Sequence, residues 1–281
     1  MLQLIVENQY GEQLNFSNVR DYAVKVTGLT PGTATINMTK IAAKDGSKFN
    51  SSTLDERNIV LTIFPCNSVE QNRINLYKYL RLKQYVKLYL KNGRRDVWIE
   101  GRIESIEGDL YEAPQQLQVS IICPDPYFKA VNATICEFSA VNPLFSFPVA
   151  FSSEGSAISQ LDTYLQKNIL NDSDEETGII VDLYATGTAL EPTIHNITTG
   201  ETFTVNHEFN AGDKVRLNTR TGEKSLTLVR DGTETNILNQ MEIGSKWFTL
   251  RVGDNLFSYT AVQGAENLRV TINLQPIFTG V

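Results

Sequence analysis

Few side chains in this sequence are of the types that do chemistry. There are three cysteines, Cys66, Cys123 and Cys136, and two histidines, His195 and His207. Three is an odd number, and the separations match no metal-binding motif, which indicates reduced and mostly buried thiols. The sequence also contains no nucleophile elbow and no phosphate-binding glycine loop. We therefore predict a protein that is not an enzyme, with no catalytic, cofactor-binding or metal-ligating residues.

An acidic run at residues 171–176 comes nearest to a metal site. Its sequence, Asn-Asp-Ser-Asp-Glu-Glu, offers carboxylates of the kind that bind calcium. It lacks the glycine and the twelfth-position glutamate of an EF-hand loop. We expect a solvated turn there.

The overall charge and hydropathy exclude two classes of partner. The 281 residues carry a formal net charge of −7. Tight binding of nucleic acid needs clustered lysine and arginine, so DNA is not expected as a bound partner, although it could pass an acidic wall without sticking. The sequence contains no run of about 18 apolar residues, so no membrane span is predicted. The first residues have no basic segment followed by a long apolar one, so no signal peptide is predicted.

The stretch from Val97 to Phe128 shows how the first half is built. Apolar and polar residues alternate over 97–104 and again over 116–121, which predicts two half-buried strands. The loop between them has turn chemistry. Pro124 and Pro126 then remove two amide donors, so the second strand must end there.

One helix is predicted in the first half. It begins at Ser68, where Ser68 and Gln71 have the spacing of a capping box. Leu76 and Leu80 lie on its apolar face. Arg73 lies close to that face, and it either extends along the edge of the core or forms an ion pair across a subunit boundary.

Turn signals predict hairpins on either side of this helix. Residues 28–32 predict a turn between strands at 22–26 and 34–38, and Asn92-Gly93 predicts another hairpin turn before the strand at 97–104. The polar segment 40–55 is expected to be a mobile loop or an extended arm. Trp98 stands on the polar face of its strand, so it either packs under the helix or lies at a subunit interface, where tryptophan is enriched.

The second half has a different pattern. After Phe138, short apolar strands recur every 8 to 12 residues with turn residues between them and no clear helix. This spacing is typical of a β-sandwich or jelly roll. We therefore expect two domains, residues 1–138 and 139–281.

Several motifs, in order along the chain, resemble the phage distal tail protein (Dit) family of siphoviruses. Arg57 opens a strand, and the run Cys-Pro-Asp-Pro-Tyr-Phe from Cys123 ends one. Residues 171–178 resemble the family's Asn-x-Gly-Asp-x-Glu-Thr-Gly turn, with Ser173 where glycine is usual. The family-signature residues are Arg57, Cys123, Pro124, Asp125, Pro126, Tyr127, Asn171, Thr177, Gly178, Trp247, Gly253 and Asn255.

This resemblance implies a mainly β fold, with a tail-tube-like N-terminal domain that forms a ring and contains one helix, and a galectin-like C-terminal β-sandwich. It implies a structural virion protein, made in the host cytoplasm, that forms a hexameric ring at the distal end of the tail. The ring would join the tail tube protein to the tail-associated hub protein, would anchor receptor-binding or adsorption proteins, and would let DNA through its channel. No cofactor and no membrane contact are implied.

Two points stay open at the level of sequence. Arg73 and Trp98 are the candidate ring-interface residues, with the 40–55 segment and exposed strand edges of the first domain as further candidates. The alternative function is a carbohydrate-binding module acting in adhesion to the host surface. The galectin sugar signature, His-x-Asn-x-Arg with a stacking tryptophan, is missing, since His195 and Asn196 are adjacent.

Overall fold

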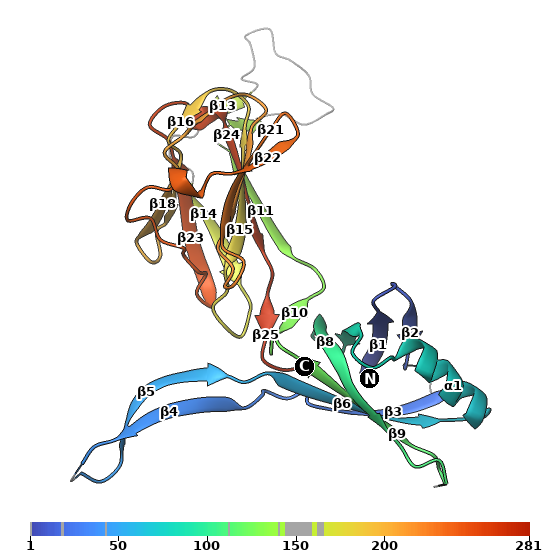
Figure 1. Ribbon diagram of the computed structural model, residues 1–281. Helices are drawn as coiled ribbons and strands as arrows, with labels where there is room; N and C mark the ends of the chain where they lie inside the picture. The colour runs from blue at the N-terminus through green and yellow to red at the C-terminus, as the bar shows by residue number, and fades with distance from the viewer. Residues whose placement is uncertain are drawn as a thin grey trace. The chain divides into compact units, whose positions relative to one another are not determined.

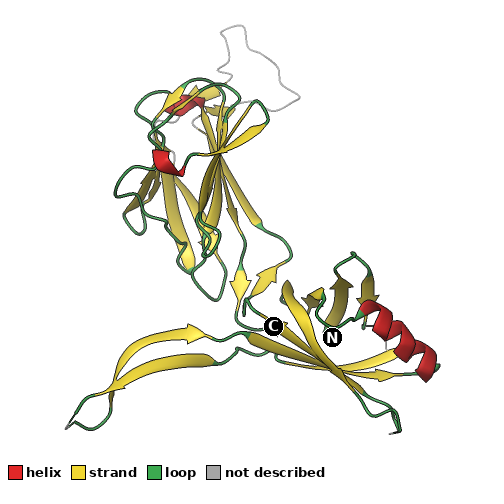
Figure 2. Cartoon of the chain, viewed as in Figure 1, coloured by secondary structure: helices red, strands yellow, loops and turns green. Residues whose placement is uncertain are grey.

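The computed structural model describes residues 2–17, 20–42, 44–111, 113–139, 141–143, 159–161 and 166–281. Within them the chain is mainly β, as predicted, with one α-helix and two short 3-10 helices among many strands (Figure 2). It divides into two compact units. Unit 1 comprises Met1–Asn132 together with Ile277–Val281, and unit 2 comprises Ala133–Pro276.

Unit 1 is built on one antiparallel sheet (Figure 1). Its strands, in spatial order, are β2 (Gln13–Asn15), β1 (Gln3–Asn8), β7 (Tyr85–Lys91), β8 (Asp96–Glu107), β9 (Leu117–Cys123), β6 (Arg57–Pro65) and β3 (Tyr22–Thr27). Alternate residues of the central strands are fully buried, so one face of the sheet forms the core. The hairpin predicted at Asn92-Gly93 is confirmed, because β7 pairs with β8 and the amide of Asn92 donates to the carbonyl of Arg95 at 2.9 Å.

Helix α1 (Val69–Tyr79) contributes to this core through Leu76, while Leu80, its C-terminal cap, is buried beside it. The predicted capping box is wrong. The side chain of Ser68 makes no cap hydrogen bond, and the Gln71 amide donates to Asn75 Oδ1 instead. The carbonyl of Ser68 accepts from the amide of Asn72, which closes the first turn through the backbone.

The predicted hairpin between 22–26 and 34–38 is also wrong. Strand β3 pairs with β6, whereas β4 (Ala34–Lys40) pairs with β5 (Ser47–Leu54). Gly28 approaches the backbone of β6 so closely that a Cβ there would lie 2.2 Å from the carbonyl oxygen of Asn58. The chain thus leaves the sheet after β3. Of the two interpretations of the 40–55 segment, the extended arm is the one observed, and β4–β5, hereafter the arm, projects from unit 1 (Figure 1).

Unit 2 is a two-sheet antiparallel sandwich. The larger sheet is β11 (Thr134–Ser139), β24 (Leu268–Leu274), β15 (Ile179–Ala185), β20 (Lys214–Asn218), β21 (Ser225–Arg230) and β22 (Thr233–Asn236). The smaller is β14 (Gln166–Asn171), β23 (Gly253–Thr260), β17 (Thr193–Asn196) and β18 (Glu201–Thr204). Short ladders join β16 (Ala189–Leu190) to β19 (Glu208–Phe209) and β12 (Val141–Pro143) to β13 (Ser159–Leu161). One core, rich in phenylalanine, fills the space between the two larger sheets.

The division between the units differs from the expected one at 138/139. Strand β11 pairs with β24 along its whole length, which places Thr134–Ser139 in unit 2. Conversely, β25 (Ile277–Phe278) pairs with β10 (Phe128–Ala130), and β10 in turn pairs with β8. The last five residues of the chain therefore belong to unit 1.

Candidate assembly surfaces

The side chains considered first for chemistry are structural in the described residues. Burial raises the pKa of the Cys123 thiol to about 12, so it stays protonated near neutral pH. Nε2 of His195 lies 2.8 Å from the Thr260 hydroxyl, and His207 packs edge-on against Phe209. No group of three or more His, Cys, Asp or Glu side chains in this part of the chain could hold a metal ion. No described helix is long and apolar enough to span a membrane.

Arg57 is the centre of unit 1's most concentrated polar contact. It is 5% exposed, and its guanidinium donates to four backbone carbonyls. Nη1 donates to Gly28 at 2.8 Å and to Thr30 at 2.6 Å, Nε donates to Pro126 at 2.7 Å, and Nη2 donates to Thr279 at 2.7 Å. The planar fork of arginine suits such a set because its donors diverge in one plane. We call this cluster the Arg57 junction.

The Arg57 junction explains the proline-rich end of β9. Cys123 is buried opposite Arg57 in the β6–β9 ladder. Beyond it the prolines stop the strand, and the carbonyl of Pro126 turns toward the guanidinium. The ring of Phe128 lies 4.7 Å from the same guanidinium carbon. Asp125 accepts the amide of Tyr127 and pairs with Lys129 at 3.0 Å, which holds the turn between the strands.

The last residues of the chain contribute to the Arg57 junction, and the sequence did not predict this. Arg95 donates to the carbonyl of Gly280 and stacks on Phe278 at 4.5 Å. The amide of Val281 donates to the carbonyl of Leu29 at 3.0 Å. Leu29 lies between the two junction carbonyls that precede the arm. The C-terminal segment and Arg57 therefore hold the base of the arm together, through residues whose sequence carries no local signal of that role.

Trp98 lies on the face of the sheet opposite the core, so it does not pack under α1. Lys87 Nζ stands 3.7 Å above its ring and Lys129 Nζ 5.2 Å away. Both lysines are also paired with acids, Lys87 with Glu100 at 3.9 Å and Lys129 with Asp125. This face is aromatic and charged, but its lysines are neutralised by neighbouring carboxylates.

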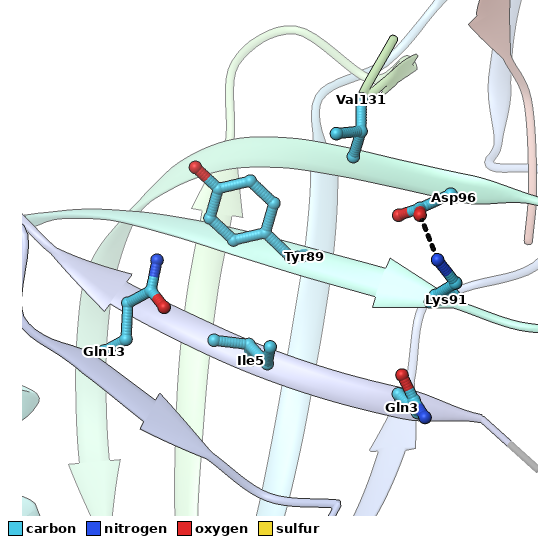
Figure 3. A pocket seen from close by; sticks show the side chains of 7 residues that line it. All are labelled: Gln3, Ile5, Gln13, Tyr89, Lys91, Asp96 and Val131. Carbon is cyan, nitrogen blue, oxygen red and sulfur yellow. Dashed lines mark hydrogen bonds and ion pairs between the residues drawn. The ribbon is translucent and has the colours of Figure 1, made fainter.

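A shallow cavity of about 280 Å³ lies beside Trp98's strand, at the β2–β1–β7 end of the same sheet (Figure 3). Its lining residues are Gln3, Ile5, Gln13, Tyr89, Lys91, Asp96 and Val131. Lys91 and Asp96 pair at 2.6 Å across one end of it. Burial, together with Glu7, raises the pKa of Tyr89, so the phenol stays neutral. The volume is at the lower limit for small-molecule sites, and the strongest polar groups are paired with each other.

Arg73 is half-buried on α1, and its Nε is buried without a hydrogen-bond partner among the described residues. It precedes Tyr77 by one helical turn on α1. Tyr77 and Arg81 line a second cavity, of about 380 Å³, between the end of α1 and the β8–β9 hairpin. Arg73 is not among the residues that line this cavity, and its role as an interface residue stays a prediction.

In unit 2 the signature residues gather at one end of the sandwich. Asn171 donates to the carbonyl of Leu250 at 3.1 Å, and Thr177 and Leu250 exchange two backbone hydrogen bonds. Asn255 closes the following turn, accepting from the amide of Arg251 and donating to the carbonyls of Arg251 and Gly253. These residues join the two loops 171–178 and 250–255 into one structure. The acidic run belongs to the first loop, where its four acids are exposed and Asn171 and Ser173 are buried.

Gly178 and Trp247 complete this end of unit 2. A Cβ on Gly178 would lie 2.5 Å from Cα of Arg220 and 2.7 Å from the carbonyl oxygen of Thr219, so only glycine fits there. Trp247 packs edge-on against Phe203 with ring centroids 5.2 Å apart. The signature residues of unit 2 therefore stabilise turns and packing, and none of them surrounds a ligand cavity described above.

The Asn255→Ala variant is expected to lower the unfolding free energy of unit 2 by about 2 kcal/mol, because three hydrogen bonds of a fully buried amide are lost. Thermal unfolding of the variant would measure this. Asn206→Ala, at an exposed position, is the matched control and should change the midpoint little. Equal midpoints for the two variants would contradict a structural role for Asn255.

Comparison with known proteins agrees with this picture. Residues 172–277 match the family model described as siphovirus-type tail component, C-terminal domain. The fold is similar to the crystal structure of the phage SPP1 Dit protein, a paradigm of the hub adsorption apparatus in phages that infect Gram-positive bacteria. The TM-score is 0.69, the identity is 12%, and 99% of each chain is covered. It is also similar to a chain of the phage P2 baseplate in its activated conformation with calcium, with a TM-score of 0.50, 9% identity and 98% of each chain covered. No curated protein matches the sequence.

Proposed function

Because this chain carries the C-terminal domain of siphovirus-type tail components and has the fold of a Dit protein along its whole length, we propose that it forms the ring at the distal end of a phage tail. The family-model match over residues 172–277 and the shared fold both support the resemblance first drawn from the signature motifs, and with it a structural role in the tail and baseplate. The similarity over 99% of both chains carries the proposal, since it includes both units.

In this proposal six copies form the ring through unit 1, and the ring joins the tail tube protein to the tail-associated hub protein. Unit 2 anchors receptor-binding or adsorption proteins. DNA crosses the channel without specific binding, which is consistent with the net charge of −7 and with the paired lysines around Trp98. Trp98 and Arg73 are the proposed interface residues, since a half-buried tryptophan outside the core and a buried Nε without a hydrogen-bond partner both gain from a partner.

The mass of the protein in solution tests the proposal. One chain is 31.5 kDa, so light scattering should give six times this value, about 189 kDa, and negative-stain images of the same sample should show rings. A single-chain mass at every concentration up to about 100 µM would contradict the proposed ring.

Removal of the arm should abolish the ring and leave the fold intact. The backbone of Asp55 donates to the carbonyl of Thr33 at 3.1 Å, so the ends of the arm are adjacent and a short Gly-Ser linker can replace residues 34–54. We expect this variant to have the mass of one chain and an unchanged circular dichroism spectrum. Deleting only Lys44–Ser52 should weaken the ring in the same direction. An intact ring in both variants would exclude the arm from the interface.

Both cavities described above lie on unit 1, so neither supports the carbohydrate-binding alternative for unit 2.

A further inference from the structure

The arm has one apolar face and one polar face. Residues that oppose each other across a ladder point to the same side of it. In the β4–β5 ladder the pairs Ala34–Leu54, Ile36–Ser52 and Met38–Phe49 lie on one side, where the polar pair Lys40–Ser47 follows them at the turn. The pairs Thr35–Thr53, Asn37–Ser51 and Thr39–Lys48 lie on the other side. The arm is therefore amphipathic, although its sequence reads as polar.

A β-bulge creates this division. Strict alternation backward from Leu54 and Ser52 would place Asn50 on the apolar face and Phe49 on the polar one. The register shifts between Asn37 and Met38, so Phe49 instead opposes Met38. The extra residue, Asn50, donates to Thr39 Oγ1 at 2.6 Å. Bulges re-aim side chains in this way.

The polar side chains on one face of the arm form hydrogen bonds within the arm, whereas the apolar side chains on the other face are exposed. On the polar face the Thr35 hydroxyl donates to Asp55 at 2.7 Å, and the Asn37 amide donates to Ser51 at 3.2 Å. On the apolar face Ile36, Met38 and Phe49 are 57%, 60% and 58% exposed. An isolated two-stranded ladder is marginal in water without a packed face. The apolar face of the arm is thus the surface that lacks a partner.

The cavity at the end of α1 offers a surface of matching chemistry. Its lining is formed by Tyr77, Leu80, Arg81, Leu82, Ile106, Gly108, Leu110 and Leu117, which we call the groove. Leu82 and Leu110 are exposed on its rim. Apart from Arg81 the groove is lined by apolar side chains and one tyrosine.

The charges near the turn of the arm are opposite to those beside the groove, and the position of the arm favours the groove of another copy. Near the turn of the arm are Lys40, Lys44 and Lys48, with Asp45 as the single described acid. Beside the groove the β8–β9 hairpin presents the acids Glu107 and Asp109. Within unit 1 the arm and the α1 end of the sheet lie at opposite extremes (Figure 1), so one molecule's arm does not reach its own groove.

We infer that the apolar face of the arm of one copy packs into the groove of the next copy, with its lysine-rich turn against the acidic β8–β9 hairpin. This inference rests on the proposed ring and names the surfaces that form it. Two different patches on opposite ends of one unit make a head-to-tail contact, and such a contact generates a ring when its rotation closes.

Surface substitutions test the groove and the arm separately. Phe49→Glu on the arm and Leu110→Glu on the groove rim alter exposed side chains, so each variant should keep the circular dichroism spectrum of the folded chain. Each should reduce the mass in solution sixfold, from the ring to one chain. Ile243→Glu, at a fully exposed position of unit 2, is the matched control and should leave the ring intact.

Disulfide trapping tests the contact directly. The Met38→Cys protein and the Leu110→Cys protein, mixed and oxidised, should give a disulfide-linked dimer of one chain of each kind. The double variant should give covalent multimers up to six chains. Met38→Cys mixed with Ile243→Cys is the control and should give no such dimer.

The outcomes separate this inference from the proposed function. If the wild-type protein and the Leu110→Glu variant both form rings, and no disulfide forms between positions 38 and 110, the arm-to-groove contact is overturned while the ring stands. Absence of rings from the wild-type protein would contradict the proposed function itself.

Discussion

The Arg57→Ala variant is expected to lose about 4 kcal/mol of unfolding free energy in unit 1 and none in unit 2. The substitution leaves the carbonyls of Gly28, Thr30, Pro126 and Thr279 without their shared donor. A hydrogen bond to a charged group contributes roughly 1.5–3 kcal/mol, and four bonds to one guanidinium are not additive. The contact with the Phe128 ring is lost as well.

The two tryptophans allow this effect to be assigned to a unit, since Trp98 belongs to unit 1 and Trp247 to unit 2. Urea unfolding followed by fluorescence, in the Trp247→Phe and Trp98→Phe backgrounds, reports each unit separately. Arg57→Lys should lie between wild type and Arg57→Ala, because an ammonium group has three donors and no fork. Arg94→Ala, at an exposed position, is the control and should cost less than about 0.5 kcal/mol. An Arg57→Ala midpoint equal to that control would contradict the junction.

Local patterns in the sequence predicted the parts of the fold that depend on neighbouring residues. The strands at 97–104 and 116–121, the turn at Asn92 and helix α1 follow from alternation, turn chemistry and the apolar face of the helix. Gly101 lies on the buried side of β8, as the alternation of that strand requires, and a Cβ there would lie 2.6 Å from Ile121 Cγ2.

Long-range pairing could not be predicted in this way. The turn at Gly28 looked like a hairpin because strands with suitable alternation flank it. The observed partner of β3 is β6, which lies more than 30 residues further along the chain and offers a more apolar strand than β4 does. The face of the arm that carries Phe49 could not be predicted either, because it depends on a bulge in a polar segment.

The Arg57 junction shows the same limit for the candidate site. Arg57 and the Cys-Pro-Asp-Pro run were singled out because they resemble a family motif, which says nothing about what they contact. One of the four acceptors, Thr279, is separated from Arg57 by 222 residues. No periodicity or turn signal connects residues so distant, so the role of the C-terminal segment in unit 1 became visible only in the structure.

A chain that stops after Pro276 is the second variant with a large expected effect, a loss of about 3 kcal/mol in unit 1. It removes the β10–β25 ladder, the Thr279 and Gly280 acceptors, and the Phe278 side chain that packs on the core. Unit 2 should keep its stability because its last strand, β24, ends at Leu274. Removal of Val281 alone deletes one backbone hydrogen bond, to Leu29, and should cost about 1 kcal/mol.

Combining the truncation with Arg57→Ala tests whether the C-terminal segment acts through the junction. Thr279 is an acceptor for Arg57, so each change removes part of what the other removes. The double variant should therefore be more stable than the sum of the single losses predicts, by at least about 1 kcal/mol. Urea unfolding of the four proteins, read through Trp98, measures this coupling. Additive losses would mean that the segment stabilises unit 1 by packing alone, and that the base of the arm does not depend on Arg57 and the C-terminal residues acting together.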